Sequence, residues 1–175
     1  GMADTQEAAR SLMEKYHDPR LAERVFEMAW THSQVTLRQL NATEAEAQLF
    51  ARLASAVVHP SRQFRAEPAI LARNRRGQSG LWGYSISGDL PIVLLRIGDR
   101  TNIELVRQMT QAHAYWRSKG LAVDLIIWNE DPSGYRQALQ DQIIGLISAG
   151  PEAHAVDRPG GVFVRHADQI SEEDR

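Results

Sequence analysis

Apolar positions in the first 60 residues recur every three or four residues, which is the spacing of helices that bury one face. We predict helices over residues 4–16, from Pro19 onward, and from Thr43 to just before Pro60. Thr43 and Glu46 have the spacing of a capping box at the start of the third helix. The stripe of the second helix consists of Leu21, Val25, Met28, His32 and Val35.

His32 lies within that apolar stripe, so we expect a hydrogen-bonded core residue rather than a metal ligand. The six histidines show no metal-ligand spacing, and we predict neither a metal site nor a cofactor.

The helical pattern stops over residues 61–80, a segment that contains five arginines and a single acidic residue, Glu67. Within this stretch, residues 73–80 can present guanidinium groups and backbone amides to a phosphate or polyanion. The segment lacks the GK[ST] ending of a phosphate-binding loop. The pattern therefore favours a basic connector that is solvated or faces a partner.

From residue 81 onward, strand patterns alternate with helices. We predict strands at Leu81–Ile86, Ile92–Ile97, Leu121–Trp128 and Val162–Val164. Two helices lie between the last three strands. One is opened by a capping box over residues 101–104 and ends at Gly120, and the other runs from Asp131 to Gly150-Pro151.

Short crossovers of this kind imply parallel pairing, and the resulting class is α/β. We predict N-terminal helices packed on a small parallel or mixed sheet built from βαβαβ units. The whole chain, 1–175, is expected to form a single domain, with a helical part (3–60), the basic connector (61–80) and an α/β part (81–175).

Composition removes several functional classes. The 175 residues contain no cysteine, which excludes disulfides, thiolate metal sites and a cysteine nucleophile. A net charge of −2 gives no field that would attract nucleic acid or an anionic membrane. No apolar run is long enough to span a membrane, and no basic-then-apolar leader is present. We therefore expect a soluble, cytoplasmic protein that neither binds nucleic acid nor inserts into a membrane.

Carboxylates follow two of the predicted strands. Asp99, Glu130 and Asp131 would meet at the edge where ligands bind in open α/β sheets. Such acids can share acid and base roles in sugar chemistry or hold a hard cation. Asp99 and Asp131 also stand where helices begin, and helix capping explains them without a function.

Aromatic residues offer a second kind of candidate, because flat rings can stack on sugars, although most aromatic side chains simply fill cores. The residues concerned are Trp82, Tyr84, Tyr115, Trp116, Trp128 and Tyr135.

Residues 73–84 (RNRRGQSGLWGY) and 86–92 (ISGDLPI) resemble a signature of cyclic β-1,2-glucan synthases. The C-terminal region of those membrane enzymes is akin to the inverting disaccharide phosphorylases, formerly glycosyltransferase family 36. Ser85 departs from this signature, where glycine is expected. The similarity continues through residues 29–34, 37–43, 112–117, 119–125, 129–131 and 157–161.

The resemblance implies a parent activity of glycan transfer or trimming, in a protein associated with the inner membrane. In this family the general acid lies in a separate helical barrel, and glucan synthesis takes place in a membrane module. Neither part has a counterpart in these 175 residues. No catalytic residue is therefore carried over.

Two functions remain open. The first is a non-catalytic accessory or scaffold domain of such a synthase. Its candidate glycan contacts, which can equally form a seam against neighbouring synthase modules, are Arg76, Gln78, Trp82, Tyr84 and Asp89. The seam predicts exposed apolar surface or a homodimer. The alternative is a free-standing α/β enzyme acting on carbohydrate, with Asp99, Glu130 and Asp131 around a cleft.

Overall fold

The computed structural model describes residues 3–131 and 136–171. The chain divides into two compact units, Gly1–Asn41 and Ala42–Arg175. That the whole chain behaves as one domain stays a prediction.

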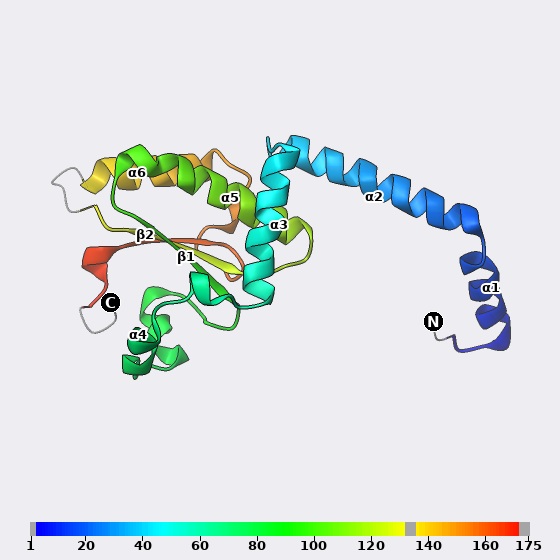
Figure 1. Ribbon diagram of the computed structural model, residues 1–175, viewed down its shortest axis with the longest axis horizontal. Helices are drawn as coiled ribbons and strands as arrows, with labels where there is room; N and C mark the ends of the chain where they lie inside the picture. The colour runs from blue at the N-terminus through cyan, green and yellow to red at the C-terminus, as the bar shows by residue number, and fades with distance from the viewer. Residues whose placement is uncertain (1–2, 132–135, 172–175) are drawn as a thin grey trace. The chain divides into compact units, whose positions relative to one another are not determined.

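The first unit holds the helices α1 (Gln6–Tyr16) and α2 (Pro19–Gln39) (Figure 1). Both begin at polar caps, because the side chains of Thr5 and Asp18 accept backbone N–H groups of the first turn at 3.2 and 2.9 Å. Pro19 stands in the first turn of α2, as predicted.

The apolar stripe of α2 is largely exposed. Val25, Met28 and Val35 are 54%, 67% and 45% exposed. His32 is also exposed, so its prediction as a core residue is wrong. Helical periodicity identifies an apolar face, but burial requires that another element cover that face.

The second unit begins with α3 (Glu44–Val58), which carries the predicted capping box. The backbone N–H of Thr43 donates to Glu46 at 2.7 Å, and the N–H of Glu46 donates to the Thr43 hydroxyl at 3.2 Å. The first of these bonds holds the pKa of Glu46 below its ordinary value. Phe50 of α3 packs against Trp116, whose indole N–H donates to the Phe50 carbonyl at 2.7 Å.

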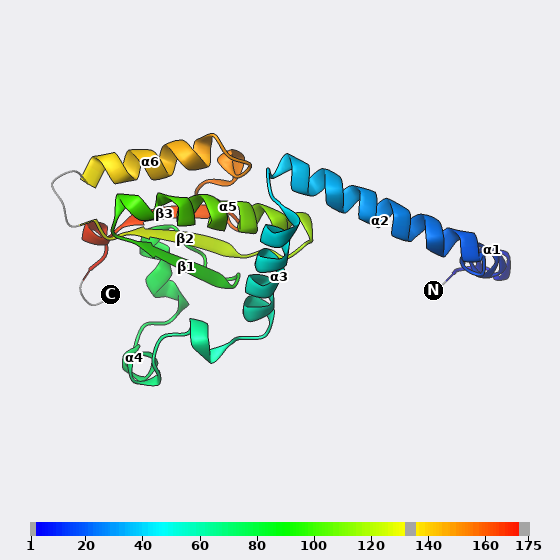
Figure 2. The same ribbon diagram turned by 45° about the horizontal axis from the view of Figure 1, so that its top comes forward.

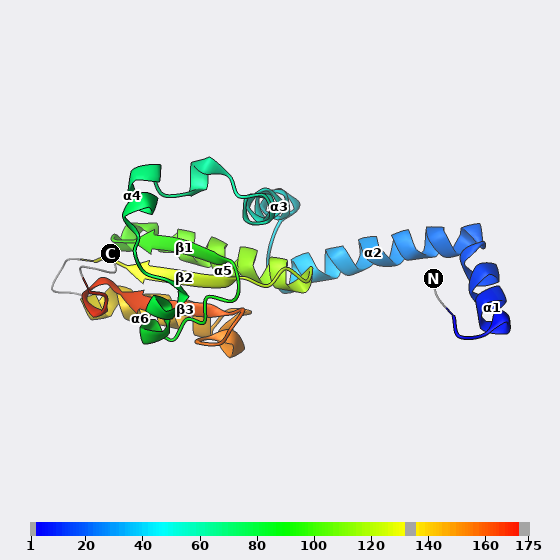
Figure 3. The ribbon, with the colours of Figure 1, turned by 90° about the horizontal axis from the view of Figure 1, so that it is seen from below.

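Three parallel strands form the sheet, in the order β1 (Ile92–Ile97), β2 (Asp124–Asn129) and β3 (Val162–His166) (Figure 3). The helix α5 (Ile103–Ser118) connects β1 to β2 (Figure 2). Along the chain, α6 (Arg136–Ser148) follows β2 and precedes β3. The α/β class and the parallel βαβαβ sheet are therefore confirmed.

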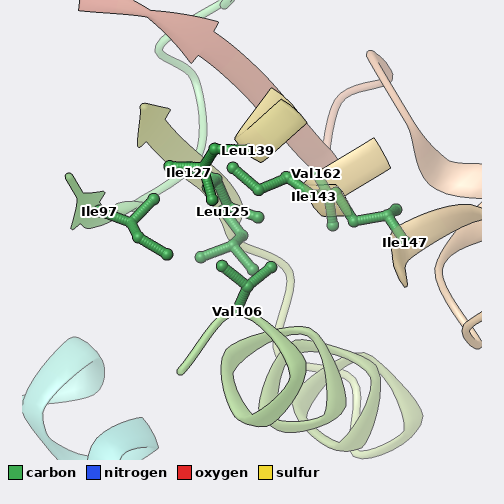
Figure 4. Close-up of a cluster of buried hydrophobic side chains, with 8 residues drawn as sticks. All are labelled: Ile97, Val106, Leu125, Ile127, Leu139, Ile143, Ile147 and Val162. Atoms are coloured by element: carbon green, nitrogen blue, oxygen red, sulfur yellow. The ribbon is translucent and has the colours of Figure 1, made fainter. Parts of the chain in front are cut away.

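Both connecting helices cover the same face of the sheet, where they enclose the main core (Figure 4). Its buried members are Ile97, Val106, Leu125, Ile127, Leu139, Ile143, Ile147 and Val162. The opposite face is covered by a smaller cluster in which Ile86 packs on Ile126 and Phe163.

Residues 81–86 do not form the predicted strand. They belong largely to the 3₁₀ helix η2 (Gln78–Tyr84), which ends at Ser85 in the left-handed conformation (φ 62°). Residues three apart share one face of a 3₁₀ helix, so Leu81 and Tyr84 both reach the sheet beside Ile86. Strand-like alternation and this threefold repeat cannot be distinguished over so short a segment.

The capping box predicted over residues 101–104 is also absent. Asp99 accepts the N–H of Thr101 at 2.8 Å and caps the short 3₁₀ helix η3 (Arg100–Asn102) instead. Glu104 pairs with Arg107.

The remaining end signals agree with the structure. Gly120 follows α5 with φ +83°, and α6 ends before Gly150. Pro132 at the predicted start of the last helix lies outside the described residues. The basic connector holds two short helices, η1 (Arg62–Phe64) and α4 (Pro68–Arg73). Within the part of the chain that the structure describes, no helix has the length and hydropathy to cross a membrane.

Candidate functional site

Three of the five predicted glycan contacts are joined by hydrogen bonds, and two of them donate to the same carbonyl oxygen. The side-chain amide of Gln78 donates to the Ser87 carbonyl at 2.9 Å and to Asp89 Oδ1 at 2.8 Å. The indole N–H of Trp82 donates to the same carbonyl at 3.2 Å. These bonds tie η2 to the loop before β1. We call Gln78, Trp82, Ser87 and Asp89 the loop lock.

Gly88 allows the loop lock to close. Its φ of +74° is a left-handed conformation, and a Cβ there would stand 2.8 Å from the side chain of Gln78. Any other residue at this position would strain the backbone and push Gln78 away from its two acceptors.

Trp82 is 63% exposed although its N–H is bonded. The lock therefore fixes the orientation of an indole ring while much of its surface stays open to solvent, which is the geometry of a stacking platform. Arg76 is exposed and lies two residues before Gln78. Its backbone N–H donates to Asn74 at 2.9 Å.

Tyr84 takes part in a different site. It lies against the sheet, and its carbonyl accepts the Nε–H of Arg165 at 2.8 Å. It borders a hollow of about 490 Å³, which we call the Tyr84 hollow. Its lining consists of Gly83, Tyr84, Ser85, Asp157, Arg165 and Gln169.

Structural partners hold two carboxylates of the alternative site, Asp99 and Glu130. The bond from the Thr101 N–H holds the pKa of the exposed Asp99 below its ordinary value. Glu130 forms a two-pronged ion pair with Arg96, with Nη2 to Oε1 at 2.7 Å. Asp131 is buried, and its N–H donates to Asn129 at 3.1 Å. A catalytic role for these acids stays a prediction.

The aromatic residues do not form one platform. Trp116 is buried, and Tyr115 packs on Phe50 with ring centres 5.9 Å apart. Trp128 is half-buried in β2. Tyr135 lies outside the described residues. Only Trp82 of this set is largely exposed among the residues that the structure describes.

A buried cluster of ionisable side chains was not predicted from the sequence. His113 Nε2 lies 2.9 Å from the Val123 carbonyl, and because a carbonyl only accepts, Nε2 carries a proton. Its Nδ1 lies 3.2 Å from Oε2 of Glu152, and both side chains are almost fully buried. Arg117 approaches the other Glu152 oxygen at 3.5 Å. No sequence pattern links α5 to Glu152, which lies beyond the next strand and helix.

These ionisable groups do not assemble into a metal site. Over residues 3–131 and 136–171, no group of three or more histidine, aspartate or glutamate side chains is arranged to hold a metal ion.

Comparison with known proteins identifies a relative. The chain is 32% identical over 160 residues to the cyclic β-(1,2)-glucan synthase NdvB of Rhizobium meliloti (strain 1021). It is related to a region of a cyclic β-(1,2)-glucan synthase. The match includes 87% of this chain but spans only 6% of the length of that synthase. No protein-family model matches the chain.

The glucan synthase resemblance of the segment around residues 73–92 is thereby confirmed. Its finer form, a likeness to glycosyltransferase family 36, stays a prediction.

Proposed function

We propose that this chain is a non-catalytic accessory region of a cyclic β-1,2-glucan synthase-like protein. The observation that carries the proposal is the relationship itself, which includes most of this chain and a small fraction of the synthase. The assignment to a region associated with family 36, and a cytoplasmic position in a parent at the inner membrane, belong to the same proposal.

The carboxylates at the sheet edge support a non-catalytic role. Asp99 accepts a backbone N–H, and Glu130 is held by the Arg96 guanidinium. A general acid or base needs a proton it can exchange with substrate, whereas these two groups are committed to a helix cap and an ion pair.

The exposed apolar side chains of α2 support a scaffold role. Phe26, Met28 and Trp30 are 75%, 67% and 68% exposed. Apolar surface of this kind is a common sign of a docking face. We infer that a neighbouring module of the synthase covers it, and that an isolated chain forms a homodimer through it.

This role is tested in the synthase of Rhizobium meliloti. The region matching this chain is deleted, and in a second version it is replaced by this chain. Cyclic β-1,2-glucan is then measured per amount of full-length synthase. We expect deletion to abolish the product and replacement to restore it. Undiminished product after deletion, or none after replacement, would overturn the accessory role.

The loop lock supports a further part of the proposal, contact with the glucan chain at Trp82. Stacking of a sugar ring on the indole buries apolar C–H surface, and Arg76 and Asp89 stand close in sequence to add polar contacts. Gln78 acts indirectly by holding Trp82 and Asp89 in place.

Calorimetric titration with linear and cyclic β-1,2-glucans tests this contact. Trp82→Ala is expected to weaken binding about tenfold. Tyr16→Ala is the matched control, because Tyr16 on α1 is an aromatic residue of similar exposure, 71% against 63% for Trp82. If both variants bind like the unchanged chain, Trp82 is not a glycan contact. Equal losses in both would refute specific stacking at the loop lock.

A further inference from the structure

The Tyr84 hollow shares no residue with the loop lock and combines polar groups from distant parts of the chain. The end of η2 supplies Tyr84 and Ser85, the loop before β3 supplies Asp157, and β3 supplies Arg165. Gln169 comes from the 3₁₀ helix η5 (Ala167–Gln169) after β3. Its volume of about 490 Å³ lies within the range of small-molecule sites.

Arg165 is the rigid centre of the hollow. Its side chain is 14% exposed, and its Nε donates to the Tyr84 carbonyl while Nη1 donates to Asp157 Oδ1, each at 2.8 Å. The guanidinium also lies 5.3 Å from the ring centre of Phe163. Nη2 has no partner among the described residues. An arginine held at three points loses little freedom when Nη2 binds a ligand.

The charges and free hydrogen-bonding groups of the hollow select a class of ligand. Asp157 neutralises Arg165, so the hollow offers no net charge to an anion. Within the described ranges, two further groups have no hydrogen-bond partner: Asp157 Oδ2 and the side-chain N–H₂ of Gln169. Open donors and an open acceptor at one hollow fit hydroxyl groups, which donate and accept at once.

Backbone conformation gives an independent observation. Ser85 (φ 62°) and Asp157 (φ 52°) are left-handed, and of the described non-glycine residues only Asn41 shares this conformation. Glycine would adopt it at lower cost, so the chain accepts strain to place a hydroxyl and a carboxylate at the hollow. Strain of this kind concentrates at functional sites.

We propose that the Tyr84 hollow binds a neutral pyranose unit, with Arg165, Asp157 and Gln169 as hydrogen-bonding partners of its neighbouring hydroxyls. The choice of glucose in β-1,2 linkage rests on the function proposed above. The hollow and the indole of Trp82 would then hold separate parts of one glucan chain.

The test is titration of the full chain with linear β-1,2-gluco-oligosaccharides, followed by calorimetry and by saturation-transfer NMR. Asp157→Asn converts an acceptor oxygen to a donor but keeps the side chain's shape, and Gln169→Ala removes the free amide. Each is expected to weaken binding several-fold, to about tenfold. Asp141→Asn is the matched control on the exposed face of α6 and is expected to bind normally. Unfolding midpoints verify that each variant is folded.

The remaining outcomes separate this inference from the proposed function. Loss of binding in Trp82→Ala alone would overturn the Tyr84 hollow and leave glycan contact at the loop lock. Displacement of the sugar by inorganic phosphate would show an anion site and overturn the neutral-ligand assignment. Absence of any glucan binding would overturn the hollow, whereas the accessory role depends on the deletion experiment and would stand.

Discussion

We predict that substitutions at the two ends of the buried His113–Glu152 contact cost unequal amounts of stability. Glu152 is fully buried, and its oxygens lie 3.2 Å from His113 Nδ1 and 3.5 Å from Arg117 Nη2. Neither oxygen has an aligned hydrogen bond within the described residues. The carboxylate therefore depends on these two neighbours for compensation of its lost hydration.

His113→Leu keeps a similar side-chain volume but removes the nearest partner of Glu152. Leaving a buried polar group without its partner costs roughly 1–3 kcal/mol. Loss of the bond to the Val123 carbonyl adds about 1 kcal/mol. Because Arg117 still approaches the carboxylate, we expect a total of about 3 kcal/mol, short of the upper end of this sum.

Glu152→Gln should cost less, about 1 kcal/mol, because glutamine keeps the shape of the side chain and its amide can donate to His113 Nδ1. Arg117 is 37% exposed and can keep its charge hydrated. The double variant His113→Leu/Glu152→Gln should then be clearly less destabilised than the sum of the two single variants. The difference measures the coupling between the two side chains.

Urea unfolding followed by tryptophan fluorescence provides the assay, since Trp116 is buried beside this cluster on α5. Equal losses in both single variants, with losses that add within about 0.5 kcal/mol in the double variant, would show that His113 and Glu152 are not coupled and contradict the prediction.

Three further stability predictions use the same assay. Thr43→Ala should cost about 1 kcal/mol at pH 7. The folded-state pKa of Glu46 lies below its ordinary 4.5. The part of the cost that comes from the Thr43 hydroxyl bond to the Glu46 carboxylate is therefore present above that value and is lost as the pH falls through the lowered pKa, whereas the cap bond from the Glu46 N–H remains. A difference that does not shrink at low pH would contradict it. Gly161→Ala should cost about 3 kcal/mol or more, since its Cβ would stand 1.8 Å from a backbone carbonyl oxygen; a normal midpoint would contradict this close approach. Ile143→Ala should cost roughly 2–5 kcal/mol, because Ile143 is fully buried. Ile144→Ala, at the next position, should change stability by no more than about 0.5 kcal/mol, because Ile144 is 47% exposed. Similar losses in both variants would contradict the assigned core face.

Short-range signals located most element boundaries correctly. Pro19, the Thr43–Glu46 box and Gly120 each act through bonds or backbone angles within a few residues. The apolar runs at 92–97 and 162–164 likewise identify strands, although both strands lie at the edges of the sheet. Signals of this kind can be read from the sequence alone, because the groups that form the bonds are neighbours along the chain.

Wrong expectations arose where several partners compete. Thr101 had the spacing of a cap, but Asp99 takes its N–H and places the cap earlier. His32 had the spacing of a core residue, yet the face of α2 on which it lies is exposed. In both cases the spacing was present in the sequence. The outcome depended on which cap residue took the N–H and on whether another element covered the apolar face.

The candidate site shows the same division. The segment containing Gln78, Trp82 and Asp89 stood out from its residues alone, and so did its glucan synthase character. Tertiary structure decided that Gln78 and Trp82 bond to one carbonyl and Gln78 also to Asp89, while Tyr84 borders the hollow beside Arg165.

The pattern of residues along the chain was therefore sufficient to predict the α/β class, the parallel sheet and the relationship to a glucan synthase, because each is encoded by neighbouring residues or by a continuous segment. Only the tertiary structure brought Arg165 to Asp157 and Tyr84, and His113 to Glu152. These contacts join residues from separate elements, and their geometry depends on how the elements pack.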